Sequence, residues 1–221
     1  MIVLRVVALA VLAASACTPV RRAPSPESSG FLDDYALLRE GGPGEIPLVY
    51  RNPAARWTQY DTVLLEPVTL WRSGRHSLDP VPEPDLARLI VDFESALRRR
   101  LGAGFELADR PGSGVMRIRL AITAARASDP VLDILNARAD PHVAVTPGGG
   151  PLHPEMQRFL DGAAIEGEIR DAQTNELLAA GVERRRREDG VTLETWTDVD
   201  RALDAWVDRL CTRLETRAGR R

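Results

Sequence analysis

Two histidines in an irregular part of the chain have side chains that suit metal chemistry. His142 and His153 flank a run of three glycines, and Asp140 and Glu155 lie close to them in sequence. Imidazole and carboxylate groups are common zinc ligands, and a zinc ion with an open position generates hydroxide for hydrolysis. The spacing matches no compact ligand motif, however, and solvated loop histidines explain the same pattern. The alternative function is therefore an envelope hydrolase, which could use a metal ion bound by these residues.

A pair of carboxylates, Glu166 and Glu168, could supply a catalytic acid and base. The two residues alternate with apolar ones, so a strand would place both on one face. Arg117 and Arg119 lie on the polar face of an earlier predicted strand that could pair with this one. Cross-strand ion pairs are the simpler explanation, and we expect no catalytic residue here.

The sequence contains no recognisable nucleophile for covalent catalysis. The segment Gly112-Ser113-Gly114 lacks the Gly-x-Ser-x-Gly pattern and precedes a strand instead of a helix, so it predicts a tight turn. All 29 basic residues are arginine, which excludes lysine Schiff bases and the lysine of phosphate-binding loops. Cys211 lies at the border of an apolar helix face, where we expect a small buried side chain.

The residues that precede Cys17 predict export from the cytoplasm. Residues 1–16 contain one arginine, an apolar run and small residues before the cysteine, which is typical of a signal peptide and too short for a spanning helix. The segment Ala14-Ser15-Ala16-Cys17 resembles the lipobox of bacterial lipoproteins. The resemblance implies cleavage before Cys17 and attachment of fatty acyl chains such as palmitate. An ordinary signal peptide followed by a chance cysteine is the alternative.

Charge and composition restrict the partners. The formal net charge is −3, and loss of Arg5 with the leader leaves 28 arginines against 32 acidic residues, a net charge of −4. This balance does not favour nucleic acid. Residues 17–30 are rich in proline, serine and arginine and predict an extended tether. The tether would join the lipid to one domain over residues 31–221.

Apolar periodicity predicts two long helices and several strands. The helices cover residues 84–101 and 197–216, and a capping box at residues 197–200 opens the second. The predicted strands cover residues 61–68, 104–108, 116–124, 163–171 and 177–184. The last two form a hairpin.

These elements predict an α/β fold, namely a single two-layer domain with a mixed sheet of four to six strands. Both long helices are expected on one face. The first strand, the first helix and a following strand would form a parallel crossover. Residues 126–161 are rich in proline and glycine and predict a long loop with helical turns at 131–135 and 155–160.

Several short segments resemble a known family. They are Ser29-Gly30-Phe31-Leu32 with Tyr35, Tyr60-Asp61 before the first strand, and Glu166-Gly167-Glu168-Ile169-Arg170-Asp171 with Thr174. They are similar to segments of a family of proteobacterial lipoproteins defined only as a domain of unknown function (number 3313), over nearly all of the mature chain. The resemblance implies a lipid anchor and an outer-membrane or periplasmic location. It implies no catalytic residue.

We therefore expect a lipid-anchored lipoprotein of the cell envelope that acts as a non-catalytic binding or accessory module without metal or cofactor. Its partners would be the membrane, through Cys17, and an envelope protein or polysaccharide, but not nucleic acid. Thr18 follows the cysteine where an acidic residue would favour retention in the inner membrane. The expected location is thus the outer membrane, facing the periplasm. The alternative function is the hydrolase built around His142 and His153.

Overall fold

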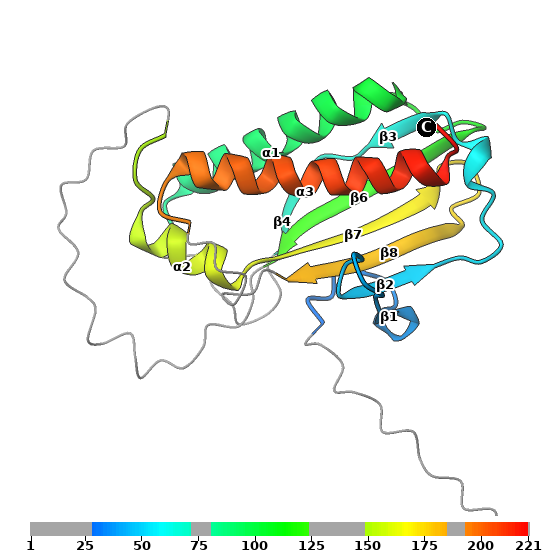
Figure 1. The fold of residues 1–221 in the computed structure, drawn as a ribbon. Coiled ribbons are helices and arrows are strands. Elements are labelled where there is room, and N and C mark those ends of the chain that lie inside the picture. The colour runs from blue at the N-terminus through cyan, green and yellow to red at the C-terminus, as the bar shows by residue number, and fades with distance from the viewer. Residues whose placement is uncertain (1–27, 72–80, 124–148, 185–192, 221) are drawn as a thin grey trace, which may run out of the picture.

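Two long helices, α1 (Glu83–Gly104) and α3 (Trp196–Arg217), pack against each other across one face of a mixed β-sheet (Figure 1). A third helix, α2 (Pro154–Gly162), lies at one end of the sheet. Single turns of 3-10 helix occur at Tyr35–Leu37 and Trp57–Gln59. The computed structural model describes residues 28–71, 81–123, 149–184 and 193–220.

Eight strands form the sheet within these described residues. They are β1 (Arg39–Glu40), β2 (Leu48–Arg51), β3 (Thr62–Leu65), β4 (Thr69–Trp71), β5 (Glu106–Leu107), β6 (Val115–Thr123), β7 (Ala164–Asp171) and β8 (Leu177–Arg184). Their order is β1-β2-β8-β7-β6-β3-β5, and β4 pairs with β6 beyond the end of β3. The strands on the β6-β7-β8-β2-β1 side pair antiparallel, whereas β3, β4 and β5 make only parallel pairs.

The expected sheet of four to six strands with two helices is therefore wrong, although the α/β class holds. The additional strands β1, β2 and β4 contain two to four residues each. They are too short to show a clear alternation of apolar and polar residues. Residues 155–160, expected as a single helical turn, belong to the nine-residue helix α2. The parallel crossover through α1 is confirmed, because β3 pairs in parallel with both β5 and β6.

The main core lies between the two long helices and the sheet. The predicted stripe of α1 is buried at Leu89, Phe93, Leu97 and Leu101, each 0% exposed. Burial of each such side chain contributes about 1.5–3 kcal/mol. Cys211 of α3 is also 0% exposed, which confirms the prediction, and burial raises the pKa of its thiol to about 12.

The N-cap of α3 lies two residues before the predicted cap at residue 197. The cap is Thr195, whose Oγ1 accepts a hydrogen bond from the amide of Asp198 at 3.3 Å. The carboxylate of Asp198 in turn accepts the amide of Thr195 at 3.0 Å. The capping box therefore spans Thr195 to Asp198 and precedes the predicted one, because Thr195 satisfies the same pattern.

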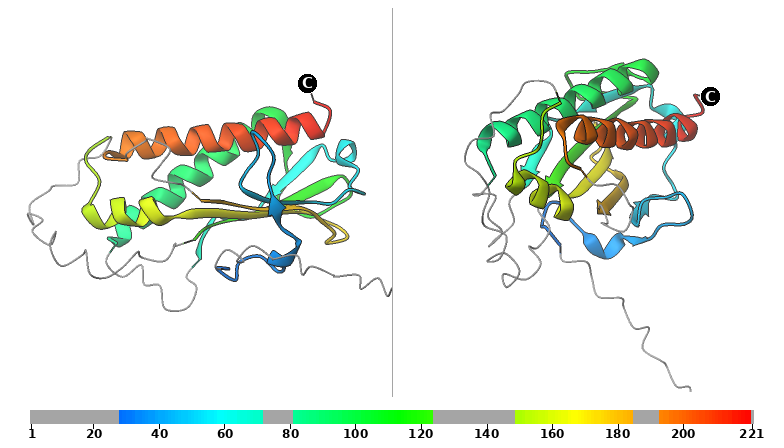
Figure 2. Two further views of the ribbon diagram at one scale, coloured as in Figure 1. Left: turned by 60° about the horizontal axis from the view of Figure 1, so that its bottom comes forward. Right: turned by 60° about the vertical axis from the view of Figure 1, so that its left-hand side comes forward.

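The N-terminal segment, residues 28–38, covers the opposite face of the sheet (Figure 2). Phe31, Leu32 and Leu38 are buried there against small residues of β6, β7 and β8. The molecule thus has a partial third layer, which corrects the two-layer expectation.

Some sequence predictions fall outside the described residues. Cys17, Asp140 and His142 are among them, as are residues 1–27. Within the described part of the chain, no helix is both long and apolar enough to cross a bilayer.

Candidate functional site

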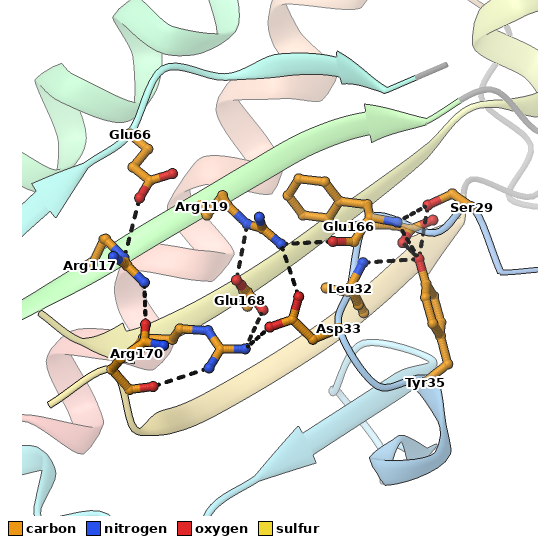
Figure 3. A network of polar contacts seen from close by, with 12 residues as sticks. Ser29, Leu32, Asp33, Tyr35, Glu66, Arg117, Arg119, Glu166, Glu168 and Arg170 are labelled. Atoms are coloured by element: carbon orange, nitrogen blue, oxygen red, sulfur yellow. Dashed lines mark hydrogen bonds and ion pairs between the residues drawn. The ribbon is translucent and has the colours of Figure 1, made fainter. Parts of the chain in front are cut away.

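The paired carboxylates lie on the outer face of the sheet, beneath the N-terminal segment (Figure 3). Glu166 is 1% exposed and Glu168 is 5% exposed. Strand β7 aims both side chains at this face, and its register with β6 sets Arg119 opposite Glu168. Burial of a carboxylate costs free energy unless the group is hydrogen-bonded or paired with a cation. The partners of these two carboxylates therefore decide what the site can do.

Glu168 lies between two arginines. Its oxygens are 3.0 Å from Arg119 Nε and 3.0 Å from Arg170 Nη2. Arg170 also contacts Asp33 at 2.6 Å, and Arg119 donates a hydrogen bond to the Phe31 carbonyl at 2.7 Å. The N–H of Arg119 Nε is not directed at Glu168, so this contact is an ion pair without a hydrogen bond. Both arginines therefore tie the N-terminal segment to β7.

Glu166 is held by two hydroxyl groups. Tyr35 Oη donates to Glu166 Oε2 at 2.5 Å, and Thr123 Oγ1 donates to Oε1 at 3.1 Å. The same tyrosine oxygen accepts the amides of Phe31 and Leu32 at 3.1 and 3.2 Å. Burial, followed by the bond to the Glu166 carboxylate, raises the pKa of Tyr35. Tyr35 thus remains a neutral donor at physiological pH.

The predicted cross-strand ion pairs are confirmed in part. Arg119 pairs with Glu168, whereas Arg117 pairs with Glu66 of the loop after β3 at 3.2 Å. The reason is register, since Arg117 lies opposite Arg170 on β7 and meets no carboxylate there. A substrate would have to displace the N-terminal segment to reach Glu166 or Glu168. The network therefore attaches that segment and is not an open catalytic pair.

The segments that suggested a family meet on β7. Ser29 and Tyr35 contact each other at 2.9 Å, and Tyr35 reaches Glu166. Tyr60 donates to Asp171, at the end of the same strand, at 2.9 Å. These sequence features are thus explained by attachment of distant segments to β7.

Replacing Tyr35 with phenylalanine is expected to lower the free energy of unfolding by about 1–3 kcal/mol, because buried polar groups lose their hydrogen-bond partner. Cleavage of residues 28–38 in limited proteolysis should accelerate in the same variant. Tyr50→Phe is the matched control, since no hydrogen bond of its hydroxyl occurs within the described residues. Equal urea midpoints for the two variants would contradict the role given to Tyr35.

The residues proposed for a metal site are only partly described. His153 precedes α2, and its Nδ1 accepts the amide of Glu155 at 3.3 Å. The Glu155 carboxylate pairs with Arg158 at 2.5 Å. In residues 28–71, 81–123, 149–184 and 193–220, no group of three His, Cys, Asp or Glu side chains could hold a metal ion. The hydrogen bond of His153 at the start of α2 explains its position. The metal site remains a prediction for Asp140 and His142, which lie outside the described residues.

A groove runs between α3 and the helix-side face of the sheet, where residues of β7, β8 and β2 line it together with α3. We call it the α3 groove. It consists of two hollows of about 310 and 440 Å³ that share Ile165, Glu183 and Trp206 at their junction. Each hollow falls within the range of small-molecule sites, roughly 300–1,000 Å³.

The floor of the smaller hollow is made of small residues. Strand register brings Gly167 and Gly181 together, and Val49 of β2 lies beside Gly181. A Cβ at Gly181 would collide with the Ile46 side chain, and one at Gly167 would lie 2.5 Å from Leu120. Glycine in the middle of a strand usually marks such a close approach. These glycines let the Ile46 and Leu120 side chains pack directly on the strand backbone, where they form part of the lining.

The walls of the groove are mainly apolar. Leu210 and Trp206 of α3 form one wall, and Ile46 forms the other. Trp206 Nε1 donates to the Glu183 carboxylate at 2.8 Å, which fixes the ring at the junction of the two hollows. Phe93 of α1 contacts the same ring edge-to-face at 5.4 Å. The arrangement can hold an elongated apolar group without performing chemistry on it.

Local sequence patterns do not reveal this groove. Trp206 and Leu210 fit the apolar face of the second predicted helix, and Gly181 lies within the predicted strand 177–184. The signal that could have pointed to the groove is the glycine at the middle of each hairpin strand.

The fold and its groove define an α/β protein with an apolar site beside its last helix, and comparison with known proteins places the chain in a family. A family model described as "Protein of unknown function (DUF3313)" matches residues 27–210, so the chain belongs to that family. No curated protein matches the chain. A solved dodecamer of a PelC variant from Paraburkholderia phytofirmans is similar at 11% identity and a TM-score of 0.33, over 77% of this chain and 93% of that chain. Likeness at this level carries no conclusion about function.

Proposed function

We propose that the protein is a lipid-anchored binding module of the cell envelope that takes an elongated apolar ligand into the α3 groove. The groove itself is the observation that carries the proposal. Its hollows are lined by apolar side chains over a floor of glycine and alanine, which is the composition of sites for apolar ligands.

The remainder of the described chain supports binding over catalysis. Glu166 and Glu168 are buried and already bonded to tyrosine, threonine and arginine side chains. The thiol of Cys211 is 0% exposed with a raised pKa, so it is protonated and inaccessible. The groove, by contrast, presents a mainly apolar lining.

The proposed anchor is compatible with an accessible groove. Residues 28–38 lie on the sheet face opposite α3 (Figure 2). A tether that ends at residue 28 would therefore reach the domain from the face opposite the groove. Lipid on Cys17, in the outer membrane and facing the periplasm, is the proposed attachment.

The groove is expected to bind Nile red, a neutral apolar dye, saturably with an increase in dye emission. Ala202→Trp and Leu210→Trp should each weaken binding by filling one hollow, and the double variant should reduce it at least tenfold. Both side chains are only half-buried, so these variants should still fold.

Val91→Trp is the matched control, because Val91 lies on α1 and is 61% exposed. It should bind the dye like the unmodified protein. Unsaturable dye uptake, or equal uptake by the double variant and the control, would refute binding in the groove.

The anchoring part has its own test. Cys17→Ser should abolish incorporation of labelled palmitate and move the protein from the membrane fraction to the soluble fraction. Membrane association that persists without attached lipid would contradict the anchor and leave the groove unaffected.

A further inference from the structure

Three arginines gather at one end of the α3 groove. Arg51 of β2 and Arg213 and Arg217 of α3 all line the smaller hollow there, and we call them the arginine end. Arg213 and Arg217 are four residues apart and so share one face of the helix. Arg213 Nη2 donates to the Gly44 carbonyl at 2.8 Å, which holds it against the loop between β1 and β2.

The positive charge at the arginine end is only partly neutralised. Arg51 forms an ion pair with Glu45, and this bond, followed by the amide of Gly42, lowers the pKa of Glu45 to about 2. Neither Arg213 nor Arg217 forms an ion pair with any carboxylate of the described residues. Three carboxylates also line the smaller hollow, but only Glu45 is paired with one of these arginines, because Glu183 is bonded to Trp206 and Arg209 and Glu168 to Arg119 and Arg170.

Arg217 is partly buried. Burial lowers the pKa of its guanidinium, and the charge of Arg51 and then that of Arg213 act in the same direction, partly opposed by Glu45. Its guanidinium lies 5.4 Å from the centre of the Trp57 ring. Cations at the last turn of a helix interact favourably with the helix dipole, which explains why arginine occurs there. The dipole does not explain why Arg51 of another element joins them at the mouth of a hollow.

From the arginine end toward Trp206, the lining of the smaller hollow is mainly apolar. From Arg217 to Trp206 the wall of α3 extends for 11 residues, or roughly 16 Å at about 1.5 Å per residue. Gly167, Ala179 and Gly181 line the hollow over this distance. A ligand that satisfies both ends therefore has an anionic head and one extended apolar chain.

We propose that the α3 groove binds a single-chain phospholipid with an anionic head, its phosphate at Arg51, Arg213 and Arg217 and its acyl chain along the apolar lining of the smaller hollow. This inference rests on the proposed function and adds the ligand class. Guanidinium groups bind phosphate with paired N–H donors, and desolvation at Arg217 strengthens such a contact.

Calorimetric titration of the full chain compares three probes below their micelle concentrations. They are myristoyl lysophosphatidylglycerol, myristoyl lysophosphatidylcholine and glycerol 3-phosphate. The anionic lipid should bind at least tenfold more tightly than the zwitterionic one, and glycerol 3-phosphate should give no measurable binding. Higher salt should weaken the anionic lipid selectively.

The double variant Arg213→Gln with Arg217→Gln should reduce affinity for the anionic lipid to that for the zwitterionic lipid, whose own affinity stays unchanged. Arg99→Gln, which alters a 68% exposed arginine of α1, is the control and should change neither affinity.

Equal affinity for the two lipids in the unmodified protein overturns this inference and leaves the groove proposal standing. Tight binding of glycerol 3-phosphate also overturns it, because the site would then recognise a bare anion. Binding of neither lipid overturns both proposals.

Discussion

Replacing Glu168 with alanine is expected to lower the free energy of unfolding by about 3–5 kcal/mol, the usual cost of removing one partner from a buried ion pair. The carboxylate is 5% exposed and lies 3.0 Å from both Arg119 and Arg170. Without it, two guanidinium groups remain close together with only the exposed Asp33 as an anion. Urea unfolding followed by circular dichroism measures the loss.

Two further variants distinguish the loss of the buried charge from the effect of replacing any glutamate in a strand. Glu40→Ala removes an exposed glutamate of β1 and should change the free energy of unfolding by no more than about 0.5 kcal/mol. Replacing Glu168 and Arg170 together with leucine should recover part of the loss, because an apolar pair leaves fewer unpaired charges. A Glu168→Ala variant as stable as Glu40→Ala would show that the network contributes nothing to stability.

Replacing Phe93 with alanine is expected to cost about 3–5 kcal/mol, as for other fully buried phenylalanines. The ring is 0% exposed and packs edge-to-face on Trp206, with the ring centres 5.4 Å apart. Because Trp206 stands at the junction of the two hollows, the variant should also weaken Nile red binding. Urea unfolding and dye titration give the two readouts.

The controls for Phe93 lie on the same helix. Val91→Ala alters a side chain that is 61% exposed and should shift stability by no more than about 0.5 kcal/mol. Phe93→Leu leaves a smaller cavity and should cost less than Phe93→Ala. Unchanged dye binding in a folded Phe93→Ala variant would show that Trp206 keeps its place without this contact.

The long elements were predictable because their patterns extend over several periods. The hairpin strand predicted at residues 177–184 coincides with β8, and the helix predicted at residues 84–101 lies within α1. The strands that the sequence did not predict, β1, β2 and β4, contain two to four residues and show no alternation over several periods. The pairing of β2 with β8 joins segments about 130 residues apart, and no local pattern specifies such a contact.

The groove and the buried network were harder to predict, for a physical reason. Alternation correctly placed Arg119 and Glu166 on the polar side of their strands, but it does not say what covers that side. The N-terminal segment buries Glu166 to 1% exposure through Tyr35, a tertiary contact. Likewise, the apolar stripe of α3 does not reveal that part of it faces an open hollow, because that depends on how far α1 reaches across the sheet.

The edge strands of the sheet restrict how copies of this protein can associate. One edge is β1, two residues long, in which Arg39 and Glu40 are both exposed. The opposite edge is formed by β5, of two residues, and by β4, of three residues, which pairs only with β6. A short edge strand with charged side chains is a poor template for backbone pairing with another chain. Neither edge therefore favours edge-to-edge polymerisation. Even at high local density, the molecules should therefore resist growth into fibrils through their backbones.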